Sequence, residues 1–262
     1  MRDFPQEIVD MVIDELHNLG EPTEYYSTIS RKWLDRSQKH YFESPRFYGH
    51  GQRNLEKWRR VIKPDPLGVS RHVRRLSLPY IKTLKGFEEH IRAFTRIERA
   101  EFESCHIFRS LVNVQPLTLL GSSLVQLKIM KAKTTASVMN SLLAALPHLR
   151  RLIAYGLSVK HGSSSIRLPT AIPFFEGANH FELWWAAPPS PRDWDWIPPT
   201  ARFGNLRVAP ICILWNAPVV NRWITSSAES LEYFCIDTIL PDLYFGGTCP
   251  GASYSVWFPI TA

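Results

Sequence analysis

A short apolar pattern recurs along most of this chain, and it constrains the fold more than any other feature. The pattern has three apolar positions, as in Leu124, Leu127 and Ile129. Two variable residues separate the first from the second, and one separates the second from the third. Its copies, which become fainter toward the C-terminus, start at Val73, Ile97, Leu124, Leu149, Ala178, Leu206 and Leu231. Successive starts are 24 to 29 residues apart, a period typical of proteins built from repeated structural units.

Each copy predicts one short strand whose apolar side chains point into a shared core. We expect parallel strands stacked in one curved sheet, with Leu127 and Leu152 buried in adjacent strands. The predicted strands span residues 73–78, 97–102, 124–129, 149–154, 206–211 and 231–236. Between them, the segments from Phe87 to Phe94 and from Val138 to Leu146 predict returning helices.

The unit from Leu142 to Leu157 resembles a leucine-rich repeat. The resemblance implies an α/β fold in which residues 71–262 form an irregular leucine-rich-repeat-like solenoid with short parallel strands. Most copies lack the Asn that usually closes the strand turn, and Ser253 to Ala262 form no polar capping repeat, which favours a shortened family member. The alternative is a non-repetitive α/β domain with accidental spacing.

The first 34 residues predict a separate helical element. Pro5 fits the first turn of a helix, because its missing N–H group breaks no hydrogen bond there. Apolar residues then form a stripe along one helical face, at Ile8, Val9, Val12, Ile13 and Leu16. Gly20 and Pro22 end this helix. Thr23 can cap a second helical stretch, whose apolar positions include Tyr26, Ile29 and Trp33.

These residues resemble the F-box that opens many fungal F-box proteins. The similarity covers about residues 1–45 and lies in the Phe4-Pro5 pair, the acidic-aliphatic helix and the stretch from Ile29 to Trp33. It implies docking on the Skp-type adaptor of an SCF ubiquitin ligase, and through that adaptor on a cullin. The adaptor-binding residues that it implies are Phe4, Pro5, Ile8, Val9, Val12, Ile13, Leu16, Ile29, Ser30, Trp33 and Leu34.

Three positions depart from the family pattern. Phe4 replaces the usual Leu and keeps its apolar character, whereas Thr23 and Thr28 replace Leu and weaken the apolar face of the second helix. A module this small cannot bury the whole stripe, so the surplus apolar surface predicts a partner-binding face. The alternative is an ordinary helical hairpin packed on its own domain.

Residues 46–70 predict a basic linker in a chain of net charge +7. They contain six Lys or Arg residues against only Glu56 and Asp65. With Tyr48 and Trp58 nearby, such a stretch could bind nucleic acid or an acidic protein. No nucleic-acid-binding motif accompanies it, so a solvated linker is favoured.

In a leucine-rich-repeat solenoid, residues between the core positions of each strand face the concave side. Here they include Arg75, Arg99, Lys128 and Arg151. Because a guanidinium can bind two oxygens at once, this face predicts an acidic or phosphorylated peptide as substrate. The proline-rich segment around Trp194 and Trp196 predicts an ordered loop that could anchor it, or rings that fold back onto the core.

The sequence indicates no catalysis, cofactor or metal site. It contains no phosphate loop, dinucleotide-binding motif, zinc-protease motif or nucleophile elbow. The nine histidines lie apart from one another, and the four cysteines form no Cys-x-x-Cys pair, which favours reduced thiols in the cytoplasm or nucleus. The apolar run at 209–215 is too short to span a bilayer.

The predicted function is that of a non-catalytic substrate receptor of an SCF-type ubiquitin ligase, acting in ubiquitin-dependent degradation. Residues 1–45 would dock on the adaptor, and residues 71–262 would bind an unidentified protein substrate. The alternative is a repeat scaffold that never engages the ligase and binds an acidic partner through its basic stretch.

Overall fold

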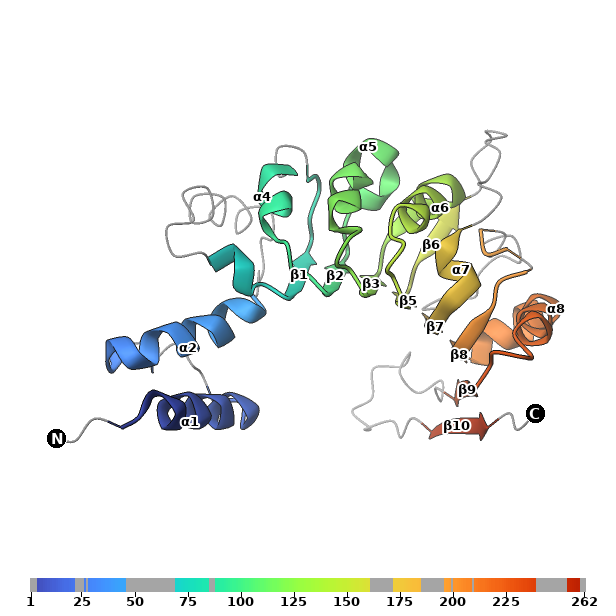
Figure 1. Cartoon of the computed structure of the whole chain (residues 1–262). Helices are drawn as coiled ribbons and strands as arrows, with labels where there is room; N and C mark the ends of the chain where they lie inside the picture. Colours follow the sequence, from blue (N-terminus) through green and yellow to red (C-terminus); the bar gives the residue numbers. More distant parts are fainter. Residues whose placement is uncertain are drawn as a thin grey trace, which may run out of the picture.

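The computed structural model describes residues 4–21, 26, 28–45, 69–84, 88–160, 172–184, 196–198, 200–208, 210–238 and 254–259. Within these residues, a pair of helices precedes an α/β unit built on one large sheet (Figure 1). The helix pair consists of α1 (Gln6–Asn18) and α2 (Arg31–Glu43). Residues 46–68, most of the predicted basic linker, lie outside the described residues.

The large sheet has eight strands in the order β1-β2-β3-β5-β7-β8-β9-β10. Neighbouring strands from β1 to β9 pair in parallel, and β10 pairs antiparallel with β9. The strands are β1 (Arg75–Pro79), β2 (Arg99–Glu103), β3 (Gln126–Met130), β5 (Arg151–Tyr155), β7 (Ala178–Trp184), β8 (Phe203–Val208), β9 (Tyr233–Thr238) and β10 (Tyr254–Pro259). A small second sheet pairs β4 (Lys133–Thr135) with β6 (Ser158–Lys160).

Parallel strands in chain order require a crossover after each strand, and short helices provide these returns. They are α4 (Glu88–Ala93), η3 (Ile107–Arg109), α5 (Leu111–Val114), η4 (Gln115–Leu120), α6 (Ala136–Ala144), α7 (Pro173–Gly177) and α8 (Pro210–Ser226), whereas η2 (Val69–His72) precedes the first strand. In Figure 1 the strands follow an arc, with α4, α5 and α6 along its outer side. The two predicted return helices are confirmed as α4 and α6, with bounds shifted by one or two residues.

Successive units leave the sheet through the same backbone turn. The residue after each of the strands β1, β2, β3 and β5 has a positive φ angle: 57° at Tyr80, 51° at Ser104, 50° at Lys131 and 60° at Gly156. The N–H groups of the first three residues donate to the backbone oxygen of the last residue in the neighbouring strand that follows. The N···O distances are 2.7, 2.8 and 2.7 Å respectively. The left-handed conformation is thus a repeated structural requirement at this position.

The apolar pattern fills the core as the sequence predicts. Leu127 pairs with Leu152 across β3 and β5, and the two side chains are 1% and 0% exposed, so that prediction is confirmed. Val73 is equally buried although it precedes β1 by two residues. The pattern therefore marks the turn that enters each strand as well as the strand itself.

Five of the six predicted strands begin two residues before the observed ones, and two further element boundaries are wrong for other reasons. The strand expected at 206–211 is β8 at residues 203–208, because Pro210 begins helix α8, and proline suits a helix start better than a strand. The second helix begins at Arg31 instead of near Thr23, because the backbone at Ser30 is extended, with φ −163°, as is usual for an N-cap. Thr23 itself lies outside the described residues.

Aromatic side chains make the core of the C-terminal half. Phe181 on β7 stacks on Phe203 on β8, with ring centroids 5.0 Å apart. Trp196 is 1% exposed and packs 6.0 Å from Phe175 and 6.3 Å from Phe181, measured between ring centroids. Trp196 therefore folds back onto the core, as one of the two predicted alternatives has it, and its buried indole does not suit a substrate anchor. Trp194 lies outside the described residues.

Candidate functional site

The helices α1 and α2 lie side by side and run in the same direction. Near their starts, Nε2 of Gln6 donates to the backbone oxygen of Lys32 at 2.8 Å. Near their ends, the rings of His17 and His40 stack with centroids 4.2 Å apart. The predicted apolar stripe has two roles. Its buried members, Val9 and Ile13, pack between the two helices, whereas other members stay exposed.

An ion pair between the two helices fixes their alignment. Nε of Arg36 donates to Oδ1 of Asp14 at 2.7 Å, and a second guanidinium nitrogen contacts Oδ2. This hydrogen bonding, together with that from His40, holds the pKa of Asp14 well below its usual range despite partial burial. Asp14 is therefore ionised at neutral pH, and α1 cannot slide along α2 without breaking a charged contact.

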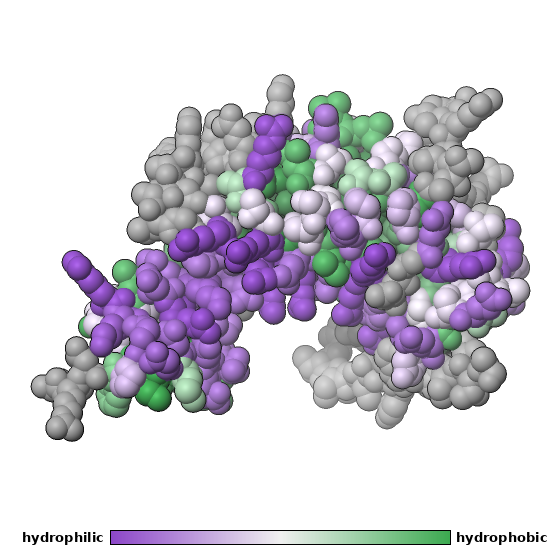
Figure 2. Space-filling model, viewed as in Figure 1, coloured by the Kyte–Doolittle hydropathy of each residue, from purple (hydrophilic) through white to green (hydrophobic). Residues whose placement is uncertain are grey.

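One side of α1 and the residues that flank it expose several large apolar side chains, here called the α1 face, with the exposed Glu15 between Met11 and Leu19. It comprises Phe4 (67% exposed), Ile8 (43%), Met11 (67%), Val12 (41%) and Leu19 (70%). Figure 2 shows hydrophobic surface gathered along this helix beside strongly hydrophilic surface. Exposed apolar clusters on a single helix are typical of surfaces that a protein partner covers.

The predicted adaptor-binding residues are distributed unevenly over this module. Those exposed to solvent are Phe4, Pro5, Ile8, Val12, Ile29 and Ser30. Leu16, Trp33 and Leu34 are partly exposed, whereas Val9 and Ile13 are buried at 2% and 0% and cannot contact a partner without a rearrangement. Met11 and Leu19 belong to the α1 face but are not among the predicted adaptor-binding residues. The spacing could have identified Met11, because it follows Ile8 by one helical turn.

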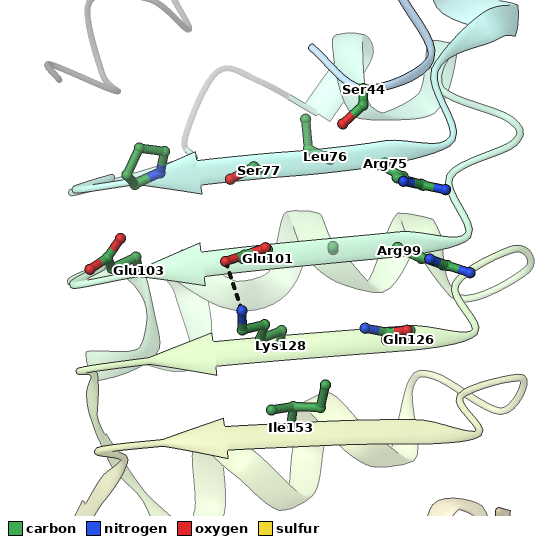
Figure 3. A pocket seen from close by; sticks show the side chains of 12 residues that line it. Ser44, Arg75, Leu76, Ser77, Arg99, Glu101, Glu103, Gln126, Lys128 and Ile153 are labelled. Carbon is green, nitrogen blue, oxygen red and sulfur yellow. Dashed lines mark ion pairs between the residues drawn. The ribbon is translucent and has the colours of Figure 1, made fainter. Parts of the chain in front are cut away.

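The inner side of the sheet presents two rows of residues, polar except for Ile153, because parallel register places equivalent positions side by side. The first row is Arg75, Arg99, Gln126, Arg151 and His180. The second row is Ser77, Glu101, Lys128, Ile153 and Glu182. Residues of β1, β2, β3 and β5 line a hollow of about 540 Å³ there, shown in Figure 3.

Two of the four predicted basic residues are neutralised by neighbours. Nζ of Lys128 lies 3.2 Å from Oε1 of Glu101, and Nη2 of Arg151 lies 2.8 Å from Oε1 of Glu182. Burial would raise the pKa of Glu182, but hydrogen bonds from His180 and Arg151 outweigh it and lower that pKa to about 2.

The other two basic residues remain available. Arg75 and Arg99 make no ion pair with any of the described residues, and Figure 3 shows them side by side at one end of the hollow. Both side chains are exposed to solvent. This corner of the sheet therefore offers two adjacent guanidinium groups, which suit a carboxylate or phosphate group.

Searches against protein-family models, curated proteins and solved structures find no match to this chain. Within the part of the chain that the structure describes, no helix is long and apolar enough to cross a membrane. Cys105 and Cys235 are buried, and burial raises the pKa of Cys105 to about 11, so this cysteine is not a reactive thiolate.

Proposed function

We propose that this chain is a substrate-receptor subunit of an SCF-type ubiquitin ligase. In this proposal the module at residues 1–45 is an F-box that docks on a Skp-type adaptor, and the following domain binds a protein substrate. The chain itself catalyses nothing, and ubiquitin transfer is the work of partner subunits. The observation that carries the proposal is the α1 face, which coincides with the N-terminal sequence resemblance.

The exposed residues of the α1 face give docking a driving force. Full burial of one aliphatic side chain contributes about 1.5–3 kcal/mol, so covering Ile8, Met11 and Val12 together would support a stable complex. A helix with such a face fits a hydrophobic groove on a partner. Val9 and Ile13 then serve the fold of the module, and the contact belongs to the exposed residues.

We further propose that the sheet domain is an irregular leucine-rich-repeat-like solenoid. The parallel strands follow one another in chain order, and four successive strands are followed by a residue with positive φ. A domain of this kind offers its inner side as an extended binding surface. The hollow beside Arg75 and Arg99 is the part of that surface best suited to an acidic or phosphorylated segment of the substrate.

The direct test is an interaction experiment with the full chain and a purified fungal Skp-type adaptor. We expect the adaptor to co-purify with the chain and to bridge it to a cullin in a three-component pull-down. If the folded chain captures neither the adaptor nor the cullin, the ligase function is wrong. The scaffold function without ligase association would then explain the domain better.

A further inference from the structure

Three side chains that can ligate metals meet where α1 and α2 end. His17 lies in the last turn of α1, and His40 and Glu43 lie one turn apart on α2. Each offers one ligand atom, and these atoms all lie within 4.8 Å of one another. We propose that His17, His40 and Glu43 bind a divalent transition-metal ion of the zinc type. This metal site is independent of the proposed ligase function.

His40 is held in the tautomer that a metal ion requires. Its Nε2 atom lies 2.6 Å from Oδ1 of Asp14, which is ion-paired with Arg36, so the carboxylate accepts and Nε2 donates. In the neutral ring, Nδ1 then keeps a free lone pair. Metal-binding histidines commonly donate their other ring N–H to a carboxylate in this manner.

The second ring nitrogen of His40, Nδ1, faces Glu43. The side chain of His40 is only 10% exposed, and Nδ1 is buried without a hydrogen-bond partner among the described residues. Nδ1 lies 3.9 Å from Oε2 of Glu43. When the ring is neutral, Nδ1 of His40 and Oε2 of Glu43 are two neighbouring acceptors with no donor between them. A cation placed there would satisfy both.

His17 completes the set from the neighbouring helix. Its ring stacks on that of His40 at an interplanar angle of 25°. Around tetrahedral zinc, with bonds of about 2.0–2.2 Å, ligand atoms are roughly 3.3 Å apart, so the three atoms must draw closer together. Because the His17 side chain is exposed, it can turn toward the shared position without disturbing the core.

Two imidazole nitrogens and one carboxylate oxygen form a ligand set that suits zinc, with a fourth position left for water. Bound metal would join the end of α1 to the end of α2. The backbone oxygen of Glu43 accepts the Arg74 N–H at 2.9 Å, so the same end of α2 adjoins the first strand of the sheet. The ion would therefore stiffen the helix pair close to its junction with the sheet domain.

The test uses the full chain, freed of metal with a chelator and titrated with Zn²⁺ by calorimetry and with Co²⁺ by visible absorption. We expect one equivalent to bind and Co²⁺ to give the strong absorption of a four-coordinate site. His17→Gln and Glu43→Gln should each weaken binding by more than the roughly 10–100-fold typical of losing an outer-shell partner. Asp14→Asn should fall within that range.

His106→Gln is the matched control, because His106 is exposed and belongs to the sheet domain, where it precedes η3. This variant should bind Zn²⁺ and Co²⁺ like the unmodified chain. His17 is itself exposed, so His17→Gln should fold normally, as circular dichroism would verify. The proposal is overturned if the unmodified chain binds no stoichiometric metal, or if His17→Gln binds metal as tightly as the unmodified chain. It is also overturned if His17→Gln alters only the pH dependence of stability.

Discussion

Arg75 on β1 and Arg99 on β2 are direct register partners on the inner side of the sheet, and neither is ion-paired with any described residue. Like charges that lie opposite each other on adjacent strands are mutually destabilising. The fold tolerates this repulsion at one corner of the hollow, while Lys128 and Arg151 nearby are both paired with carboxylates. An anion that bridges the two guanidinium groups would relieve it.

We therefore predict that Arg75→Gln or Arg99→Gln leaves the free energy of unfolding unchanged or raises it by about 0.2–1 kcal/mol. Urea unfolding at low ionic strength measures this.

Inorganic phosphate should raise the melting temperature of the unmodified chain more than that of the double variant, which combines Arg75→Gln with Arg99→Gln, at equal ionic strength. Phosphate also stabilises proteins generally, so Arg92→Gln on α4 is the control and should respond like the unmodified chain. Equal responses in all three proteins would contradict an anion site.

Glu182 should make the stability of the sheet domain sensitive to acid. Its pKa falls from the usual 4.5 to about 2 in the folded chain, so its contribution is complete above about pH 4.5 and is lost as the pH falls toward 2. The full shift corresponds to roughly 3 kcal/mol, and the part of it that solvent screens makes the measured effect smaller. In Glu182→Gln, stability should be lower at neutral pH and should fall less between about pH 5 and about pH 3. Glu176→Gln, an exposed change on α7, should keep the full acid dependence.

Leu152 should be essential to the packing of the strands. Leu152→Ala removes a side chain that is 0% exposed and pairs with Leu127, so we expect a loss of about 2–5 kcal/mol in the free energy of unfolding. Val125 precedes β3 and is 42% exposed, so Val125→Ala is the control, with a change of about 0.5 kcal/mol or less. Chemical unfolding compares the two. Similar small losses in both variants would mean that the apolar pattern does not form the core.

The parallel sheet could be predicted because its information is local and repeated. Residues such as Leu124, Leu127 and Ile129 mark the core positions of each unit without reference to the rest of the chain. The strand at β8 was misplaced because Pro210 determines where α8 begins, and the fainter apolar copies there do not distinguish a strand from a helix start. Two alternatives stayed open for Trp196 because burial of an aromatic ring depends on Phe175 and Phe181, which lie elsewhere in the sequence.

The candidate sites depend on contacts between distant segments, and most of their detail could not be predicted. Sequence alone did not show that Arg151 is neutralised by Glu182, 31 residues later. The spacing of the histidines along the chain predicted that they lie apart, although α1 and α2 bring His17 and His40 into contact. The division of the N-terminal stripe into buried and exposed members likewise requires the position of α2, which begins later than expected.

The most direct measurement is the affinity of the full chain for a Skp-type adaptor, determined by calorimetry. We predict that Ile8→Ala combined with Met11→Ala weakens binding by about tenfold or more, because each truncation removes apolar area that docking buries. Both residues are exposed, so the variant should unfold like the unmodified chain. Val112→Ala, which changes a residue 72% exposed on α5, should bind as tightly as the unmodified chain. Equal affinities in the folded double variant and the unmodified chain, or no binding by either, would contradict the account.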